Sequence, residues 1–355
     1  MAVAAAAADA DNEEDQVKSA LHTRTLSRIP FVAAAVVCGL AVTSLAATAQ
    51  APAPTPRPPA ATARPATPAP RPVASASVKT FATAKQAADA LIAAAKTFDV
   101  GKLQELFGPD IEGIVQLDNY AQARQITSEF VAKADEKTSI SVAPGTGTRA
   151  FLLVGDGDWP FPIPIVKRGA RWSFDAEAGR QEIRNRRIGR NELDAIQIAR
   201  GYVEAQHEYA HRLREGQVTQ YAQRIISTPD TQDGLAWRKP DGSWDGPIGE
   251  AVARAIEQGY SSRSEPYRGY FFKILKGQGP AAPLGQLDFV VNKVMIGGFA
   301  LVAAPAAYGI TGLKTFIVSH DGVVYEKDLG TATLDEFTKM ERFNPDRTWS
   351  PVEEP

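Results

Sequence analysis

The sequence predicts an α+β protein with two domains, each made of helices packed on an antiparallel sheet. In residues 79–180, helical spacing of apolar residues comes first and strand-like runs separated by turn residues follow. The same order recurs in residues 181–330, so helices and strands are segregated rather than alternating, which is typical of α+β folds. A chain of 355 residues is also long enough for two cores of ordinary size.

Residues 1–49 are predicted to be a disordered leader followed by an export signal. Arg24 and Arg28 precede an uncharged run from Ile29 to Ala49, which has an apolar centre and ends in a small-x-small cleavage pattern, Ala47-Thr48-Ala49. The run is also long enough to cross a bilayer, so residues 29–49 are a candidate membrane tether if they are not removed. We therefore expect a periplasmic or secreted protein, either cleaved or anchored in the inner membrane.

Residues 50–78 are predicted to be a disordered Pro/Ala-rich linker. Nine prolines fall between Pro52 and Pro72, and such a stretch favours an extended polyproline conformation and cannot bury a core. At about 3.1 Å per residue, the linker could hold a folded domain tens of ångströms from a membrane.

The first domain, residues 79–180, is predicted to place three helices before a four-stranded meander. The helices are expected at 82–98, 100–106 and 119–134, and the strands at 139–142, 149–154, 161–166 and 171–174. Glycine-rich turns separate these strands, which favours antiparallel pairing of neighbours.

The second domain, residues 181–330, is predicted to lay one long helix against a sheet of four or five strands. Asn191 is a good N-cap for a helix over Glu192–Glu215. A further helix is expected over Ile248–Glu257, after a turn-rich stretch at 227–246. Strands are expected at 269–275, 288–291, 299–303, 315–318 and 323–327, with a tight hairpin at Ser319-His320-Asp321-Gly322. Residues 331–355 are predicted to be a C-terminal extension with a frayed end.

Five arginines lie within the expected connection between the domains, Arg180–Arg190. Two interpretations remain open for this run. It is either a basic patch for an anionic glycan or lipid, or a solvated helix face paired with Glu177 and Glu182.

Five longer motifs stand out along the chain: Asp158–Pro164, Ile188–Leu193, Glu265–Phe272, Gly297–Ala300 and Val323–Gly330. Together they resemble one family of exported bacterial proteins, domain of unknown function 2950. The resemblance covers about Thr80 to Val352 and implies an exported protein with no established activity and no catalytic residues to carry over. The second domain, with Tyr308–Gly312 and the hairpin that follows, is also similar to the globular heads of type IV pilin-like proteins.

The sharpest enzymatic motif is His207-Glu208-Tyr209-Ala210-His211, which matches the H-E-x-x-H signature of zinc peptidases. On a helix, the two imidazoles would share one face and the glutamate could activate a metal-bound water. His320 is the only other histidine after the signal, and Arg212 follows the motif directly, which disfavours a cation. The alternative is two histidines on a solvated helix turn, so we assign no metal ligand.

Composition disfavours several other classes of protein. The net charge of −2 argues against a nucleic-acid binder, and four histidines with a single cysteine, Cys38, argue against zinc fingers and iron–sulfur centres. No G-x-S-x-G elbow or phosphate-binding loop occurs. We therefore predict no cofactor and assign no catalytic or cofactor-binding residue.

Aromatic residues near turns suggest a binding role instead. Rings on loops can stack on sugars or grip a peptide, although core packing explains them equally simply; they are Trp159, Phe161, Trp237, Trp244, Tyr267, Tyr270, Phe271 and Phe272. The sequence thus favours a non-enzymatic binding or scaffolding module of the cell envelope, with an envelope protein or a glycan as partner. The alternatives are a pilin-like component of a secretion or pilus system and a zinc-dependent hydrolase that uses His207, Glu208 and His211.

Overall fold

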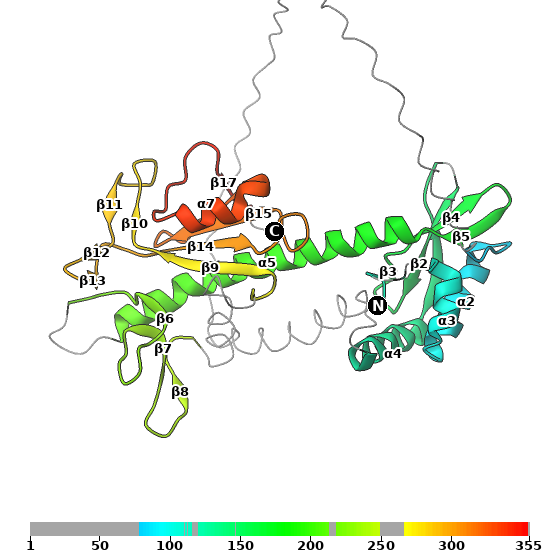
Figure 1. The fold of residues 1–355 in the computed structure, drawn as a ribbon, viewed down its shortest axis with the longest axis horizontal. Helices are drawn as coiled ribbons and strands as arrows, with labels where there is room; N and C mark the ends of the chain where they lie inside the picture. Colours follow the sequence, from blue (N-terminus) through cyan, green and yellow to red (C-terminus); the bar gives the residue numbers. More distant parts are fainter. Residues whose placement is uncertain are drawn as a thin grey trace, which may run out of the picture. The chain divides into compact units, whose positions relative to one another are not determined.

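The structure of the chain is a computed structural model. It describes residues 78–109, 111, 113–115, 120–145, 147–212, 218–248 and 266–353 (Figure 1). The predicted export signal at 29–49 and most of the Pro-rich linker lie outside these residues. Of the helix expected over Ile248–Glu257, the structure describes only Ile248. Of the helix expected over Glu192–Glu215, it describes the residues up to Arg212.

Three helices open the first folded lobe. They are α2 (Ala84–Lys96), α3 (Val100–Phe107) and α4 (Tyr120–Glu136). α2 begins at Thr83 and α3 at Asp99, because each of these side chains accepts a hydrogen bond from a free backbone N–H of the first turn, that of Gln86 or Lys102. One face of α2 is buried and consists of alanines together with Leu91, which is 1% exposed.

An antiparallel sheet follows these helices. It contains β1 (Thr138–Val142), β2 (Arg149–Val154), β3 (Trp159–Pro160), β4 (Ile165–Arg168) and β5 (Arg171–Phe174), in the order β1-β2-β4-β5 with β3 paired to β2. α2 packs on β4 and β5, and α4 packs on β2. Alternate residues of β2 point into the core, so Ala150, Leu152 and Val154 are buried. The predicted α+β arrangement of helices followed by a meander is confirmed for this lobe.

One long helix, α5 (Ala176–His211), contributes to both hydrophobic cores. The predicted start at Asn191 is wrong, because the helix begins at Asp175, whose carboxylate accepts a hydrogen bond from Ala178 N–H. The arginine-rich segment, which was expected to connect the two domains, is therefore part of this helix. Its ion pairs at helical spacing stabilise this first half, as between Arg186 and Glu182.

The second lobe is built on a five-stranded antiparallel sheet (Figure 1). Its strands are β9 (Tyr270–Leu275), β14 (Ala300–Pro305), β15 (Lys314–Ser319), β16 (Val324–Asp328) and β17 (Ser350–Pro351), in the order β17-β16-β15-β14-β9. α5 packs on β14, β15 and β16, and α7 (Thr333–Lys339) packs on β14. The predicted helix on a sheet of four or five strands is confirmed, and so is the hairpin at Ser319–Gly322, where Gly322 has φ 78°. The strand expected at 288–291 is not part of this sheet, because these residues belong to two short hairpins, and β17 is the fifth strand instead.

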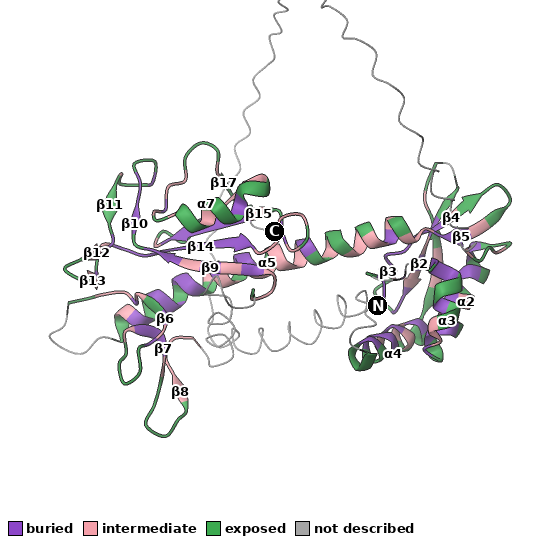
Figure 2. Cartoon of the chain, in the orientation of Figure 1, coloured by how far each residue is buried: buried purple, intermediate pink, exposed green. Residues whose placement is uncertain are grey.

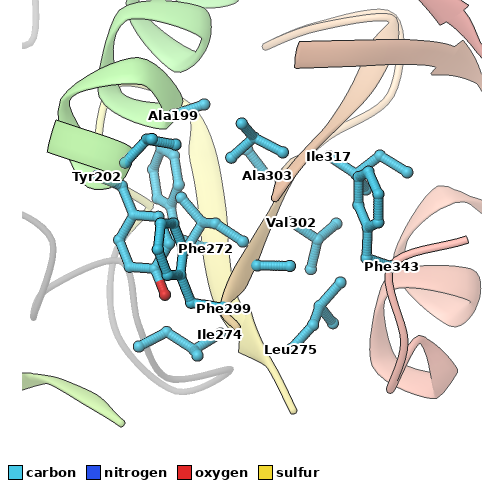
Figure 3. Packing of buried hydrophobic residues seen from close by; sticks show 14 of the residues in the cluster. Ala199, Tyr202, Phe272, Ile274, Leu275, Phe299, Val302, Ala303, Ile317 and Phe343 are labelled. Atoms are coloured by element: carbon cyan, nitrogen blue, oxygen red, sulfur yellow. The ribbon is translucent and has the colours of Figure 1, made fainter. Parts of the chain in front are cut away.

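β14, which lies between β15 and β9 in this sheet, is buried on both faces (Figure 2). Close by, Tyr202 and Phe299 lie on the α5 side of the strand, and Ile317 and Phe343 lie on the other (Figure 3). Phe343 is fully buried, so residues of the expected C-terminal extension complete this core. The frayed end was expected from Pro351 on, and this is wrong for Pro351, which pairs with Tyr325 of β16 as part of β17.

Short strands surround this sheet in two places. β6 (Arg224–Ile226), β7 (Gly234–Arg238) and β8 (Trp244–Asp245) form a three-stranded sheet, and β7 and β8 lie inside the stretch at 227–246 that was expected to be rich in turns. Two consecutive hairpins follow β9 and are formed by β10 (Gly277–Gln278) with β11 (Leu287–Asp288) and by β12 (Val290–Val291) with β13 (Val294–Met295). A turn of 3₁₀ helix, η1 (Gly330–Ala332), precedes α7. In the described part of the chain, no helix has the length and apolar character needed to cross a bilayer.

Candidate functional site

The H-E-x-x-H motif occupies the last turn of α5, as its spacing predicted. Glu208 forms an ion pair with Arg212, whose guanidinium also lies 3.6 Å from Asp245. The His207 ring packs edge-on against Phe299, with ring centroids 5.4 Å apart. The glutamate is thus paired with a cation, and one of the two imidazoles is held against an aromatic ring.

The His320 ring lies against the same phenylalanine as His207 does, Phe299. Its ring centroid lies 6.0 Å from that of Phe289 and 6.3 Å from that of Phe299, so both His207 and His320 contact Phe299. The Nδ1 atom of His320 is buried and has no hydrogen-bond partner among the described residues. Across those residues, no group of three histidine, cysteine, aspartate or glutamate side chains is placed to hold a metal ion.

Gly298 makes this cluster possible. It has φ 132°, and a Cβ atom there would lie 2.9 Å from His320 Nδ1 and 2.9 Å from Phe289 Cε1. Only glycine leaves room for both rings at this backbone angle. The Gly297-Gly298-Phe299-Ala300 motif therefore has a packing explanation: it lets Phe299 enter the aromatic core below α5.

A second cluster, which we call the α5 hub, lies at the middle of α5. It consists of Asn191, Glu192, Asp194, Arg268 and Thr311. Asn191 donates a hydrogen bond to the Thr311 carbonyl (2.8 Å), and Glu192 accepts from the backbone N–H groups of residues 313 and 314 (2.8 and 3.0 Å). Asp194 and Arg268 form an ion pair at 2.9 Å. The hub thus ties two loops that lie far along the sequence to one face of α5.

Gly269 and Gly312 allow the loops to approach the hub this closely. A Cβ atom on Gly269, which has φ 77°, would lie 2.6 Å from Asn191 Nδ2, and one on Gly312 would meet the Tyr270 hydroxyl. That hydroxyl donates a hydrogen bond to the Lys314 carbonyl at 2.9 Å. Burial, reinforced by the nearby Glu192 and Glu326 carboxylates, raises the pKa of Tyr270 far above its ordinary value, so the phenol stays protonated as a donor.

Apolar side chains lie exposed beside this rigid hub. Leu193 is 61% exposed between Glu192 and Asp194, and Ile310 is 51% exposed next to Thr311. Leu313, whose own N–H binds Glu192, is also exposed. Exposed aliphatic side chains held on a fixed backbone are typical of protein contact sites.

Most of the aromatic candidates are already engaged within the fold. Phe161, Tyr270 and Phe272 are buried in the two cores. Arginines cover three of the other five rings: Arg186 lies over Trp159 at 5.1 Å, Arg238 over Trp244 at 4.7 Å and Arg268 over Tyr267 at 5.6 Å. These rings therefore do not present an open stacking platform for a sugar.

Some of the arginines in the first half of α5 are bonded within the fold, and others are exposed. Arg186 donates to the Pro160 carbonyl and Arg180 pairs with Glu177, which fits the interpretation of a paired helix face for these two. Arg184 and Arg187 are exposed. Sequence reasoning missed the hub, because its hydrogen bonds and ion pair join residues that are 74 to 122 positions apart and no local pattern links them.

Comparison with known proteins places the chain in a family. Residues 78–352 match the family described as protein of unknown function (DUF2950), so the chain belongs to that family, and the predicted resemblance is confirmed. No curated protein and no solved structure matches the chain. The family match spans both cores and α5, including every residue of the hub.

Proposed function

We propose that this protein is a non-enzymatic binding module of the cell envelope that grips a protein partner at the α5 hub. The single observation that carries the proposal is the exposure of Leu193 and Ile310 on a backbone fixed by the hub's hydrogen bonds. A rigid backbone loses little conformational entropy on binding, so the apolar area that a partner covers there contributes directly to affinity.

The chemistry of the partner follows from the hub's surroundings. The exposed aliphatic side chains would contact an apolar patch on the partner. The Asp194–Arg268 pair lies at the edge of this surface with 18% and 31% of the two side chains exposed, and it can orient polar groups around that patch. Export through residues 29–49 and the spacer at 50–78 would present the module to envelope proteins.

The zinc-hydrolase alternative draws no support from the geometry of its motif. Glu208 is paired with Arg212, whereas a general base in this role would face the metal-bound water. The pilin-like alternative differs from the proposal in its partner, which would be a pilus or secretion subunit. The experiment below identifies the partner.

The test is site-specific photo-cross-linking in the cells that produce the protein. A photoreactive residue at position 310 or 193 is expected to capture one discrete envelope protein, identified by mass spectrometry. The matched control is position 142, where Val142 is 52% exposed in the other lobe. Capture of a pilus or secretion subunit would favour the pilin-like alternative, whereas equal labelling from all three positions would refute the hub as a binding surface.

Localisation is tested separately by fractionation combined with N-terminal sequencing of the purified protein. A chain that begins near residue 50 in the periplasm or medium would support cleavage. An intact chain in the membrane fraction would support a tether through residues 29–49. An intact chain in the cytosol would contradict the proposal of an envelope module.

A further inference from the structure

The turn between β10 and β11 presents a leucine in an unusual way. Gly285 N–H donates to the Ala282 carbonyl at 3.0 Å, which closes a four-residue turn through Pro283 and Leu284. Leu284 takes φ 68°, a left-handed conformation that normally requires glycine or asparagine at this position. Its side chain is 90% exposed and so gains almost nothing from packing within this chain.

This turn is supported from inside by polar groups. Gln278 is buried, and its amide donates to the carbonyls of Pro283 and Gly285, the latter at 2.7 Å. Asn344 accepts a hydrogen bond from Ala281 N–H at 2.9 Å, and Arg342 donates to the carbonyl of Leu287 at 3.2 Å. The fold therefore holds the exposed leucine in place rather than leaving it on a loose loop.

The surroundings of Leu284 match a lipid surface. From Gly277 to Leu287 the chain carries no charged residue, and Leu287 is 40% exposed. In the sequence, the exposed Lys276 precedes this loop and the exposed Lys293 follows it in the β12–β13 turn, and Asp288 between them is paired with Arg342. An uncharged apolar tip on a segment flanked in the sequence by lysines suits insertion among acyl chains below anionic headgroups.

We propose that the Leu284 turn inserts into the surface of an anionic bilayer. This contact is separate from the α5 hub and does not depend on the proposed protein partner. One leucine and its neighbours bury too little apolar area for tight binding on their own. The predicted tether at residues 29–49, with the linker at 50–78, would hold the turn at a high effective concentration near the same membrane.

The strained backbone supplies an informative variant. Leu284→Gly removes the inserted side chain and suits the left-handed backbone better than leucine does, so the variant should fold at least as stably as the parent chain. A loss of membrane contact in this variant would therefore not be explained by unfolding.

The experiment uses the full chain carrying Cys38→Ser, with a fluorescent label on Gln286→Cys. The protein is added to vesicles of phosphatidylglycerol and phosphatidylethanolamine that contain spin-labelled quencher lipids. Quenching at position 286 is expected, with at least a threefold loss on Leu284→Gly. A label on Val142→Cys should stay unquenched, while Leu284→Gly should leave the thermal midpoint unchanged or higher.

Two results would overturn the proposal. One is quenching at position 286 that is absent, or that is the same with leucine and glycine at position 284. The other is a change in oligomeric state on Leu284→Gly without any quenching, which would assign the leucine to a protein contact. Neither result bears on cross-linking at the hub, so the two proposals can fail independently.

Discussion

At the scale of single residues, Gln206 shows how a buried polar side chain links α5 to the chain beyond it. It is fully buried, and its amide donates to the Tyr202 hydroxyl (2.9 Å) and the Ala222 carbonyl (2.8 Å), while its carbonyl accepts from Ala222 N–H (2.8 Å). All the polar atoms of this side chain thus take part in hydrogen bonds that close the second core.

We predict that Gln206→Leu destabilises the protein by about 2 to 4 kcal/mol, because it leaves both backbone groups of Ala222 buried without a partner. The measurement is the free energy of unfolding from urea titration. The matched control is Gln181→Leu, an exposed glutamine on the same helix, which should change stability by less than about 0.5 kcal/mol. Equal effects of the two substitutions would contradict the role given to Gln206.

Local residue patterns predicted burial well but predicted partners poorly. The alternation in β9 correctly buries Tyr270, Phe272 and Ile274, because strand periodicity is a local property. The ion pair between Asp194 and Arg268 joins residues 74 positions apart, and neither position differs in pattern from an ordinary surface charge. Long-range polar pairs depend on the three-dimensional fold, so the sequence alone could not reveal the hub.

At the scale of elements, helix α5 shows why a local cap signal can mislead. Asn191 is an effective N-cap type, but the segment before it already forms a helix in which Ile183 packs against the first core and Ile188 is buried. The burial of this segment outweighed the capping preference of Asn191. Its side chain donates a hydrogen bond to the Thr311 carbonyl instead. The short strands β6 and β8 were missed for a different reason, because three and two residues carry too little periodicity to be recognised.

Three glycines of α5 provide a test of its packing. A Cβ atom on Gly179 would lie 2.6 Å from Ile163 Cγ1, whereas nothing lies within 4 Å of a Cβ atom on Gly201. Gly189 is equally open. The same substitution should therefore have opposite effects along one helix.

We predict that Gly201→Ala stabilises the protein by about 0.5 to 1 kcal/mol, because alanine restricts the unfolded chain and suits a helix interior. Gly179→Ala should destabilise it by about 1 to 3 kcal/mol through overpacking against Ile163. Thermal and urea unfolding of the two variants provides the comparison. If both substitutions changed stability in the same direction, the close packing of α5 on Ile163 would be wrong.

At the scale of the whole molecule, the central feature is that one helix belongs to two hydrophobic cores. Ile183 of α5 packs against the first core, and residues from Ala195 to Tyr209 form part of the second. Neither core keeps its full set of apolar residues if α5 unfolds. The two lobes should therefore unfold together, although each has its own sheet.

We predict that Gly189→Pro separates the unfolding of the two cores. Proline in a helix interior removes a backbone hydrogen bond and costs about 3 kcal/mol or more, and Gly189 lies between the residues that serve each core. Hydrogen exchange of the β2 and β14 amides is the measurement. In the parent chain both strands should exchange with similar free energies of opening, and in the variant those energies should diverge. Gly189→Ala is the matched control, since it leaves the helix continuous and should keep the two strands coupled. If the free energies of opening of β2 and β14 already differed in the parent chain, the two cores would be shown to unfold independently, although α5 contributes to both.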